Sequence, residues 1–138
     1  MNHPPARPLP PAIVSSLSFE AGLRRCLGRV ELYDRIARRF LDTRAADAQR
    51  ARAALAAGAL DVVRKLAHDL TSTAGTLGAE RLSEAAHALQ SGIDDGAAPG
   101  ELARLVDAFA DQHAQALAAL QAYARGDIDL RHFSTRGT

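Results

Sequence analysis

From Ser16 onward, almost every residue of the chain favours the α-helix. Alanine and arginine dominate, β-branched residues are sparse, and no stretch alternates between apolar and polar residues over the length of a strand. Gly28, Gly58 and Gly78 each follow a helical segment, and glycine is common just past a helix C-terminus. The sequence therefore predicts an all-α fold.

Six helical segments are predicted, of which the first is short. They cover about residues 18–26, 31–42, 46–57, 61–77, 80–92 and 101–123, with Ser18 as a candidate N-cap of the first. The second carries an apolar stripe of Leu32, Ile36, Phe40 and Leu41. The four longest segments can close a bundle through short connections. We therefore expect an up-down four-helix bundle with a short additional N-terminal helix.

The ends of the chain differ from this helical region. The first eleven residues hold five of the six prolines, and proline fixes φ and removes the backbone donor. We interpret residues 1–15 as a proline-rich, semi-rigid linker, residues 16–125 as the folded domain and residues 126–138 as a C-terminal tail. Such a linker before one compact domain favours a module tethered to something larger, with an ordinary chain terminus as the alternative.

Composition excludes several classes of protein. The chain has 138 residues, the size of one domain, and its 17 basic and 16 acidic side chains leave a net charge of +1. Nucleic-acid binding normally shows a basic excess, and aromatic residues, at 4%, are too few for stacking on bases. Apolar stretches fall far short of the ~18 residues that a membrane span needs. We expect a cytoplasmic monomer that contacts neither nucleic acid nor membrane.

Segment 61–77 is amphipathic, and its one histidine lies at the centre of the polar face. At about 100° per residue, the apolar side chains fall opposite His68; they are Val63, Leu66, Leu70 and Leu77. The residues on the histidine's own side are polar or small: Arg64, Lys65, Thr71, Ser72 and Gly75. Glycine inside a helix costs roughly 1 kcal/mol relative to alanine. Gly75 therefore favours a surface that another protein approaches closely.

An exposed imidazole in this position can carry chemistry. Imidazole is substantially neutral at cellular pH, and the unprotonated nitrogen of the neutral ring is a nucleophile that can hold a transferred group. Lys65, one turn earlier, could offset the charge of a bound phosphoryl group. Geometry alone leaves open the alternative that His68 is an exposed histidine with no role.

The sequence AHDLTSTAGTLGA at 67–79, followed by Leu82, Ala86 and Leu89, resembles the signature of histidine-containing phosphotransfer (HPt) domains. These domains are intermediates of bacterial multistep phosphorelays. Residues 19–41 and 53–61 also resemble the family's opening and its lead-in to the phosphorylated helix, so the likeness covers about 16–123. It implies an up-down four-helix bundle without kinase activity. It also implies that this domain is the C-terminal module of a hybrid sensor histidine kinase.

The resemblance also implies roles for particular residues. His68 would accept the phosphoryl group, and Gly75 and Gly78 match the family's small positions. Gln90 stands where many members carry a Gln or Glu that hydrogen-bonds the imidazole. An antiparallel hairpin that turns at 78–79 independently brings position 68 level with about 89, so Gln90 could hold the ring in one tautomer.

Two positions depart from the family pattern. Members usually carry Lys and then Gly three and four positions after the histidine, where this chain has Thr71 and Ser72. The loss of that lysine removes a cation from the phosphoryl site, and Lys65, the only lysine of the chain, could partly replace it. The expected docking surface for the partner consists of Arg64, Thr71, Ser72 and Gly75.

The resemblance implies that the partners are the receiver domains of a hybrid sensor kinase and of a response regulator. Such a partner would supply an aspartyl phosphate and the bound Mg²⁺ that neutralises developing charge, so the chain itself needs no cofactor. It has no Gly-rich phosphate loop and should not bind ATP. The competing hypothesis is a helical docking module that binds a receiver domain, or another partner, without carrying phosphate.

Other candidate sites are weaker. Glu84 and His87 form a single E-x-x-H motif without matching glutamates, so we expect no metal site and a surface position for His87. His113 continues an apolar stripe and is interpreted as a buried histidine between helices, and Cys26 as a small core residue. The second segment also has a basic face, which we interpret as a solvated surface that could in addition dock an acidic partner. This face comprises Arg35, Arg38, Arg39 and Arg44.

Overall fold

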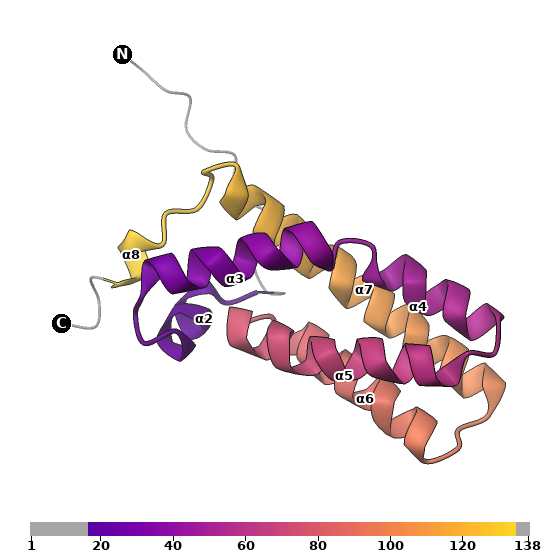
Figure 1. The fold of residues 1–138 in the computed structure, drawn as a ribbon. Coiled ribbons are helices and arrows are strands. Elements are labelled where there is room, and N and C mark those ends of the chain that lie inside the picture. The colour runs from indigo at the N-terminus through magenta and orange to yellow at the C-terminus, as the bar shows by residue number, and fades with distance from the viewer. Residues whose placement is uncertain (1–16, 135–138) are drawn as a thin grey trace.

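The computed structural model describes residues 17–134, and the predicted linker therefore lies outside the described residues. The described chain contains α-helices and no strand (Figure 1). The helices are α2 (Phe19–Arg25), α3 (Val30–Thr43), α4 (Asp47–Ala56), α5 (Leu60–Leu77), α6 (Glu80–Asp94), α7 (Pro99–Ala124) and α8 (Arg131–Ser134). The predicted all-α class is confirmed.

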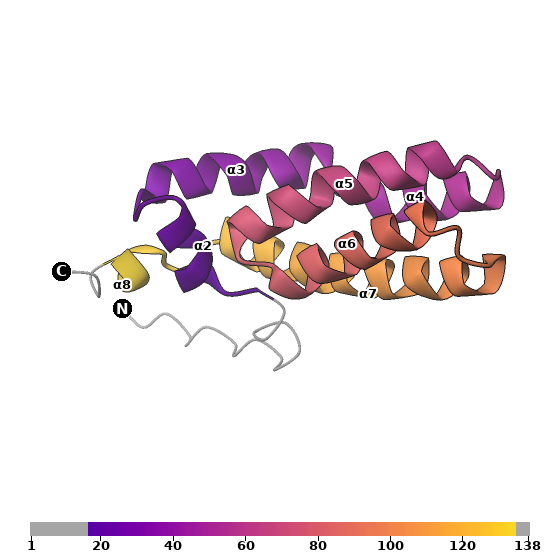
Figure 2. The ribbon, with the colours of Figure 1, turned by 90° about the horizontal axis from the view of Figure 1, so that it is seen from below.

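The helices form an elongated four-helix bundle in which α3 and α4, end to end, take the place of one long helix. α5 and α6 make an antiparallel hairpin, and α7 packs along α6 over much of the length of the molecule (Figures 1 and 2). α3 and α4 follow one another along the same side, and each contacts both α5 and α7. The predicted four-helix bundle is confirmed, with one position shared by two consecutive helices and with the short α2 at one end.

Most helix ends follow the local chemistry of the sequence. Ser18 caps α2, because its hydroxyl accepts a hydrogen bond of 3.1 Å from the amide of Ala21. The chain turns at Gly58 and Gly78 with φ of 72° and 88°. The predicted loop 94–100 is shorter than expected, because α6 continues to Asp94 and α7 begins at Pro99, whose fixed φ suits a first helical turn.

The buried side of α3 differs from the predicted stripe. Tyr33, Ala37 and Phe40 are buried, whereas Leu32, Ile36 and Leu41 are only half-buried. The prediction missed Tyr33 because a phenol is costly to bury without a partner. Here the Tyr33 hydroxyl donates a hydrogen bond of 2.8 Å to the carbonyl of Leu77.

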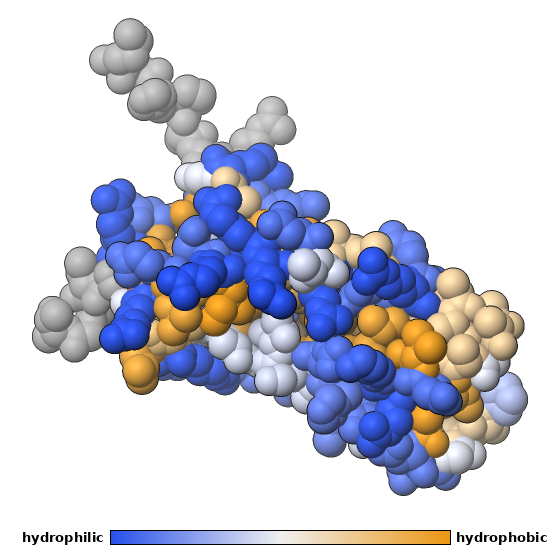
Figure 3. All heavy atoms as spheres, viewed as in Figure 1, coloured by the Kyte–Doolittle hydropathy of each residue, from blue (hydrophilic) through white to orange (hydrophobic). Residues whose placement is uncertain are grey.

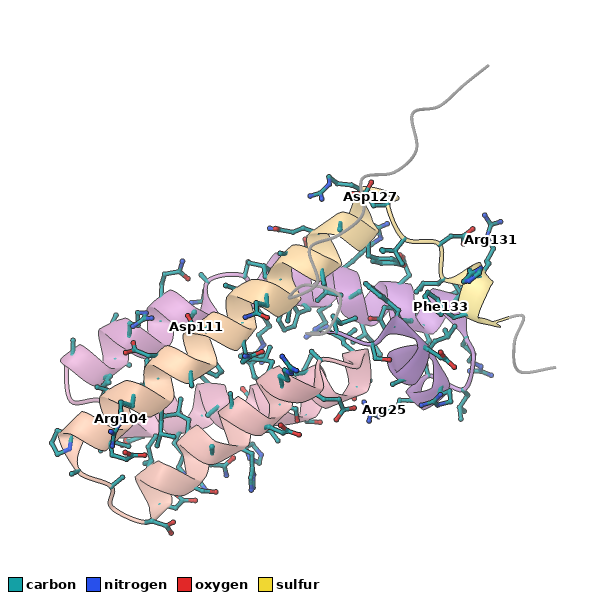
Figure 4. All side chains as sticks on the ribbon, turned by 180° about the vertical axis from the view of Figure 1, so that it is seen from behind. Arg25, Arg104, Asp111, Asp127, Arg131 and Phe133 are labelled. Carbon is teal, nitrogen blue, oxygen red and sulfur yellow. The ribbon has the colours of Figure 1, made fainter. Side chains whose placement is uncertain are left out.

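The C-terminal end of α5 is held by residues far away in sequence. The Gly78 carbonyl accepts a hydrogen bond of 2.9 Å from the amide of Ser18. Beside it, Phe19 stacks on Phe133 with ring centroids 6.5 Å apart, and Figure 4 shows Phe133 on the short α8 next to this end of the bundle. Leu130 is buried, so the residues after 125 include some that belong to the core. The domain boundary itself stays a prediction.

Two other predicted positions agree with the structure. His113 is buried and its ring lies between Phe40 and Phe109, with Nε2 2.8 Å from the Arg44 carbonyl oxygen. Cys26 is buried in the core, and this burial raises the pKa of its thiol. Neither side chain is available at the surface.

Candidate functional site

The bundle presents His68 to solvent from the middle of α5. The apolar residues of this helix are buried, and His68 is exposed on the opposite side. The buried residues are Val63, Leu66, Ala67, Leu70, Ala74 and Leu77. Because a whole face of α5 is fixed by the core, the direction of the histidine side chain is determined by the helix itself.

Two contacts define the register between α5 and α6. Arg64 donates two hydrogen bonds to Asp94, of 2.6 and 3.1 Å, and the Ser83 hydroxyl donates one of 2.7 Å to the carbonyl of Thr71. Since neighbouring antiparallel helices run in opposite directions, pairing of 64 with 94 brings 68 level with 90. Pairing of 71 with 83 brings 68 level with 86, so the part of α6 at the height of His68 is about 86–90 and includes Gln90 at its end.

Gln90 is half-buried on α6, at the edge of the exposed face. The structure, which describes both residues, shows no hydrogen bond between the side chains of His68 and Gln90. The fold thus brings α5 and α6 together near His68 and Gln90, but the hydrogen bond expected between these two side chains is not formed. His87, one turn earlier on α6, is exposed, as expected.

Lys65 is engaged in an ion pair on the other side of the histidine. Its ammonium lies 3.6 Å from a carboxylate oxygen of Asp69, and Arg44 lies 3.3 Å from the same oxygen. Arg44 also pairs with the buried carboxylate of Asp47. Lys65 therefore belongs to a charged cluster between α5 and the junction of α3 and α4, although its side chain stays 78% exposed.

The other residues of the expected docking surface differ in their exposure; they are Thr71, Ser72 and Gly75. Ser72 is exposed, and Thr71 is half-buried with its hydroxyl donating to the Ala67 carbonyl at 2.9 Å. Gly75 is half-buried, and an added Cβ there would meet only the Ser83 hydroxyl at an ordinary 3.5 Å. Packing inside the chain therefore does not require glycine at this position.

Sequence reasoning missed two residues that shape this region, Arg25 and Asp94. Arg25 of α2 donates to the carbonyl of Gly75 and pairs with Glu80, and Figure 4 shows it beside the turn between α5 and α6. Asp94 fixes Arg64, whose hydrogen bonds hold the pKa of the Asp94 carboxyl below its usual range. The hairpin register could have suggested Asp94, whereas nothing local in the sequence points to Arg25.

Two kinds of feature are absent from the described region. Residues 17–134 contain no group of three His, Cys, Asp or Glu side chains that could hold a metal ion. None of the helices within this range combines the length and the apolar character needed to cross a membrane.

An elongated helical bundle that exposes a histidine from one well-packed helix is the arrangement expected of a histidine phosphocarrier domain. The family model of the Hpt domain matches residues 35–125. The chain belongs to the Hpt domain family. Comparison with curated proteins and with solved structures gave no match.

Membership settles the general role. Hpt domains are phosphotransfer domains of phosphorelays; they carry phosphoryl groups, have no catalytic activity of their own, and interact with receiver domains. The match contains both α5 and α6 and therefore the whole seam on which His68 and Gln90 lie.

Proposed function

We propose that this chain accepts a phosphoryl group from the aspartate of one receiver domain onto His68 and passes it to the aspartate of a response regulator. The observation that carries the proposal is the exposure of His68 at the centre of the polar face of α5, inside the part matched by the Hpt family. On the composition and the family resemblance described above, we further propose a cytoplasmic monomer that works as the C-terminal module of a hybrid sensor kinase and needs no ATP site.

The transfer step follows from the chemistry of imidazole. The lone pair of one ring nitrogen attacks phosphorus, the N–P bond forms, and the P–O bond to the aspartate breaks. The carboxylate leaves with its electron pair, and a proton on the second ring nitrogen can pass to water. The second transfer reverses these steps on another receiver. Mg²⁺ bound by the receiver supplies charge neutralisation, so this chain contributes the nucleophile and its position.

The test is transfer of label from phosphorylated receiver domains of the same organism. Purified chain is mixed with each receiver carrying radioactive phosphate, and the product is treated with acid and with alkali. Phosphohistidine is acid-labile and alkali-stable, so that behaviour of the label supports the proposal. Docking of a receiver without any label on the chain contradicts it.

The second candidate is a docking module that binds a receiver domain without carrying phosphate. Thr71 and Ser72 favour it, because they replace the lysine and glycine usual in the family next to the phosphoryl site. The labelling experiment separates the two functions directly.

Gln90 is proposed to position the imidazole, and its substitution tests this role. We expect Gln90→Ala to slow transfer by about tenfold, the effect of losing roughly 1.4 kcal/mol of orientation, while Gln90→Glu retains most of the rate because a carboxylate also accepts from the ring N–H. The measurement is the single-turnover rate of transfer, with circular dichroism as the control for folding. Equal rates of transfer for Gln90→Ala and the wild type would show that Gln90 does not position the imidazole.

Thr71→Lys tests whether the missing lysine limits transfer. A cation about 4 Å from a phosphoryl oxygen gains roughly 1 kcal/mol in water, which corresponds to a rate increase of about fivefold. Thr76→Lys is the matched control, because it adds the same charge to α5 roughly 12 Å further along the helix axis than His68. Similar rates for the two variants would show that a cation at position 71 has no special effect.

A further inference from the structure

The polar face of α5 carries a basic residue on each side of His68. At roughly 100° per residue, Arg64 lies about 40° from His68 in one direction around the helix and Lys65 about 60° in the other. Arg64 pairs with Asp94 on α6. Lys65 pairs with Asp69, one turn later on α5. The strength of these two ion pairs decides which cation can turn towards a negative charge placed on His68.

Two hydrogen bonds hold Arg64 in its ion pair. Arg64 donates them to the two carboxylate oxygens of Asp94, over 2.6 and 3.1 Å. Parallel bonds of this kind fix the planar guanidinium in one orientation. Departure of Arg64 would also leave Asp94 without a cation from the part of the chain that the structure describes. Arg64 is therefore expected to stay on α6.

The ion pair between Lys65 and Asp69 is looser. The Lys65 ammonium makes one contact of 3.6 Å with Oδ2 of Asp69, and its side chain is 78% exposed. Exposed ion pairs within one helix contribute little to stability. The same carboxylate oxygen lies 3.3 Å from Nη2 of Arg44. Asp69 therefore keeps a cation when Lys65 leaves.

Arg44 is held at the junction of α3 and α4 by three further contacts. Its Nη1 lies 3.3 Å from a carboxylate oxygen of Asp47, which is fully buried. Its main-chain carbonyl oxygen lies 2.8 Å from Nε2 of the buried His113, and its amide donates to the carbonyl of Phe40. In Figure 3 hydrophilic atoms cover the face of the molecule where α5 passes this junction. Asp69 thus has one fixed cation, Arg44, and one mobile cation.

Lys65 is close enough to His68 to contact a group bound to its ring. Residues three positions apart on a helix have Cβ atoms about 5–6 Å apart, and the flexible lysine side chain spans this distance. A phosphoryl group carries up to about two negative charges, whereas Asp69 carries one that it already shares with Arg44. The phosphoryl group is therefore the stronger partner for Lys65.

We propose that Lys65 leaves Asp69 for the phosphoryl group on His68, and that Arg44 then remains as the partner of Asp69. The inference rests on the proposed function for the presence of the phosphoryl group. It makes Asp69 and Arg44 positioning residues, because they hold the lysine beside the histidine and release it at little cost.

The test uses the fact that Lys65 is the only lysine of the chain. The full chain labelled with ¹⁵N-lysine gives one side-chain ammonium signal by NMR. Phosphoramidate serves as the donor, so no receiver is needed: an imidazole nitrogen attacks phosphorus, the P–N bond of the donor breaks and ammonia leaves. We expect the lysine signals of the wild type and of Asp69→Asn to differ before phosphorylation and to coincide afterwards. In the His68→Gln background the difference should persist after the same treatment.

The rate at which His68 takes up label from phosphoramidate is the second measurement. We expect Lys65→Met to slow labelling by about fivefold, the effect of one cation next to a phosphoryl oxygen in water. Arg44→Gln, which leaves Lys65 as the cation on Asp69, should slow labelling in the same direction. Arg104→Met is the matched control, because Arg104 is also 78% exposed and pairs with a carboxylate of its own helix, α7, far from His68 (Figure 4). Circular dichroism monitors the folding of all variants.

The outcomes separate this inference from the proposed function. Coinciding lysine signals after phosphorylation, together with slow labelling of Lys65→Met, support the inference even when no receiver transfers its phosphoryl group. A difference between the wild type and Asp69→Asn that persists after phosphorylation overturns it, and so does labelling of Lys65→Met as fast as Arg104→Met; neither result affects transfer from receivers. A His68 that accepts no phosphoryl group from phosphoramidate or from any receiver overturns both.

Discussion

His68→Gln is expected to abolish phosphorylation of the chain completely. Glutamine has a similar size and can hydrogen-bond, but its amide nitrogen has no lone pair free to attack phosphorus. No other side chain of α5 can take the place of the His68 imidazole, because the core fixes the orientation of this helix. The measurement is acid-labile, alkali-stable label after incubation with phosphorylated receivers, and the loss should reach the detection limit.

The matched control is His87→Gln, which removes another exposed histidine one helix away. We expect this variant to keep its label, because the proposed acceptor, His68, is unchanged. Both variants should unfold within about 0.5 kcal/mol of the wild type, since neither side chain contributes to the core. Label retained by His68→Gln would show that the phosphoryl group resides elsewhere and would reject the proposed function.

Much of this site could be predicted because the relevant information is local. The helical period of α5 places Val63 and Leu70 inside and His68 outside, and burial of the apolar face is the main force that orients a surface helix. The turn at Gly78 then brings the part of α6 that contains Gln90 alongside His68. The height of Gln90 relative to His68 follows from these two facts.

The contacts that the sequence did not predict are those between distant segments. Lys65 pairs with Asp69 on its own helix, and only the fold brings Arg44 to the same carboxylate. Arg25 likewise reaches Gly75 because α2 folds back on the end of α5. Periodicity assigns a residue to a face, but it does not say which partner that face meets.

Gly78→Ala is expected to cause the largest loss of stability among the variants considered. Gly78 has a φ of 88°, which costs a residue with a Cβ about 1–2 kcal/mol. An added Cβ would also overlap the carbonyl oxygen of Ser18 and lie 3.0 Å from the amide nitrogen of Gly22. To relieve the overlap, the chain before α2 must move and the hydrogen bond from Ser18 to Gly78 is lost. We expect a total cost of about 3 kcal/mol or more.

Gly58→Ala separates the two causes, because Gly58 has a similar φ of 72° but no atom within 4 Å of an added Cβ. It should therefore show only the backbone cost of about 1–2 kcal/mol. Urea denaturation of the two variants and the wild type measures the difference. Equal destabilisation would mean that α2 adjusts freely at the end of α5. A larger loss for Gly78→Ala would show that α2 is anchored there, and with it Arg25, which holds the Gly75 carbonyl two turns beyond His68.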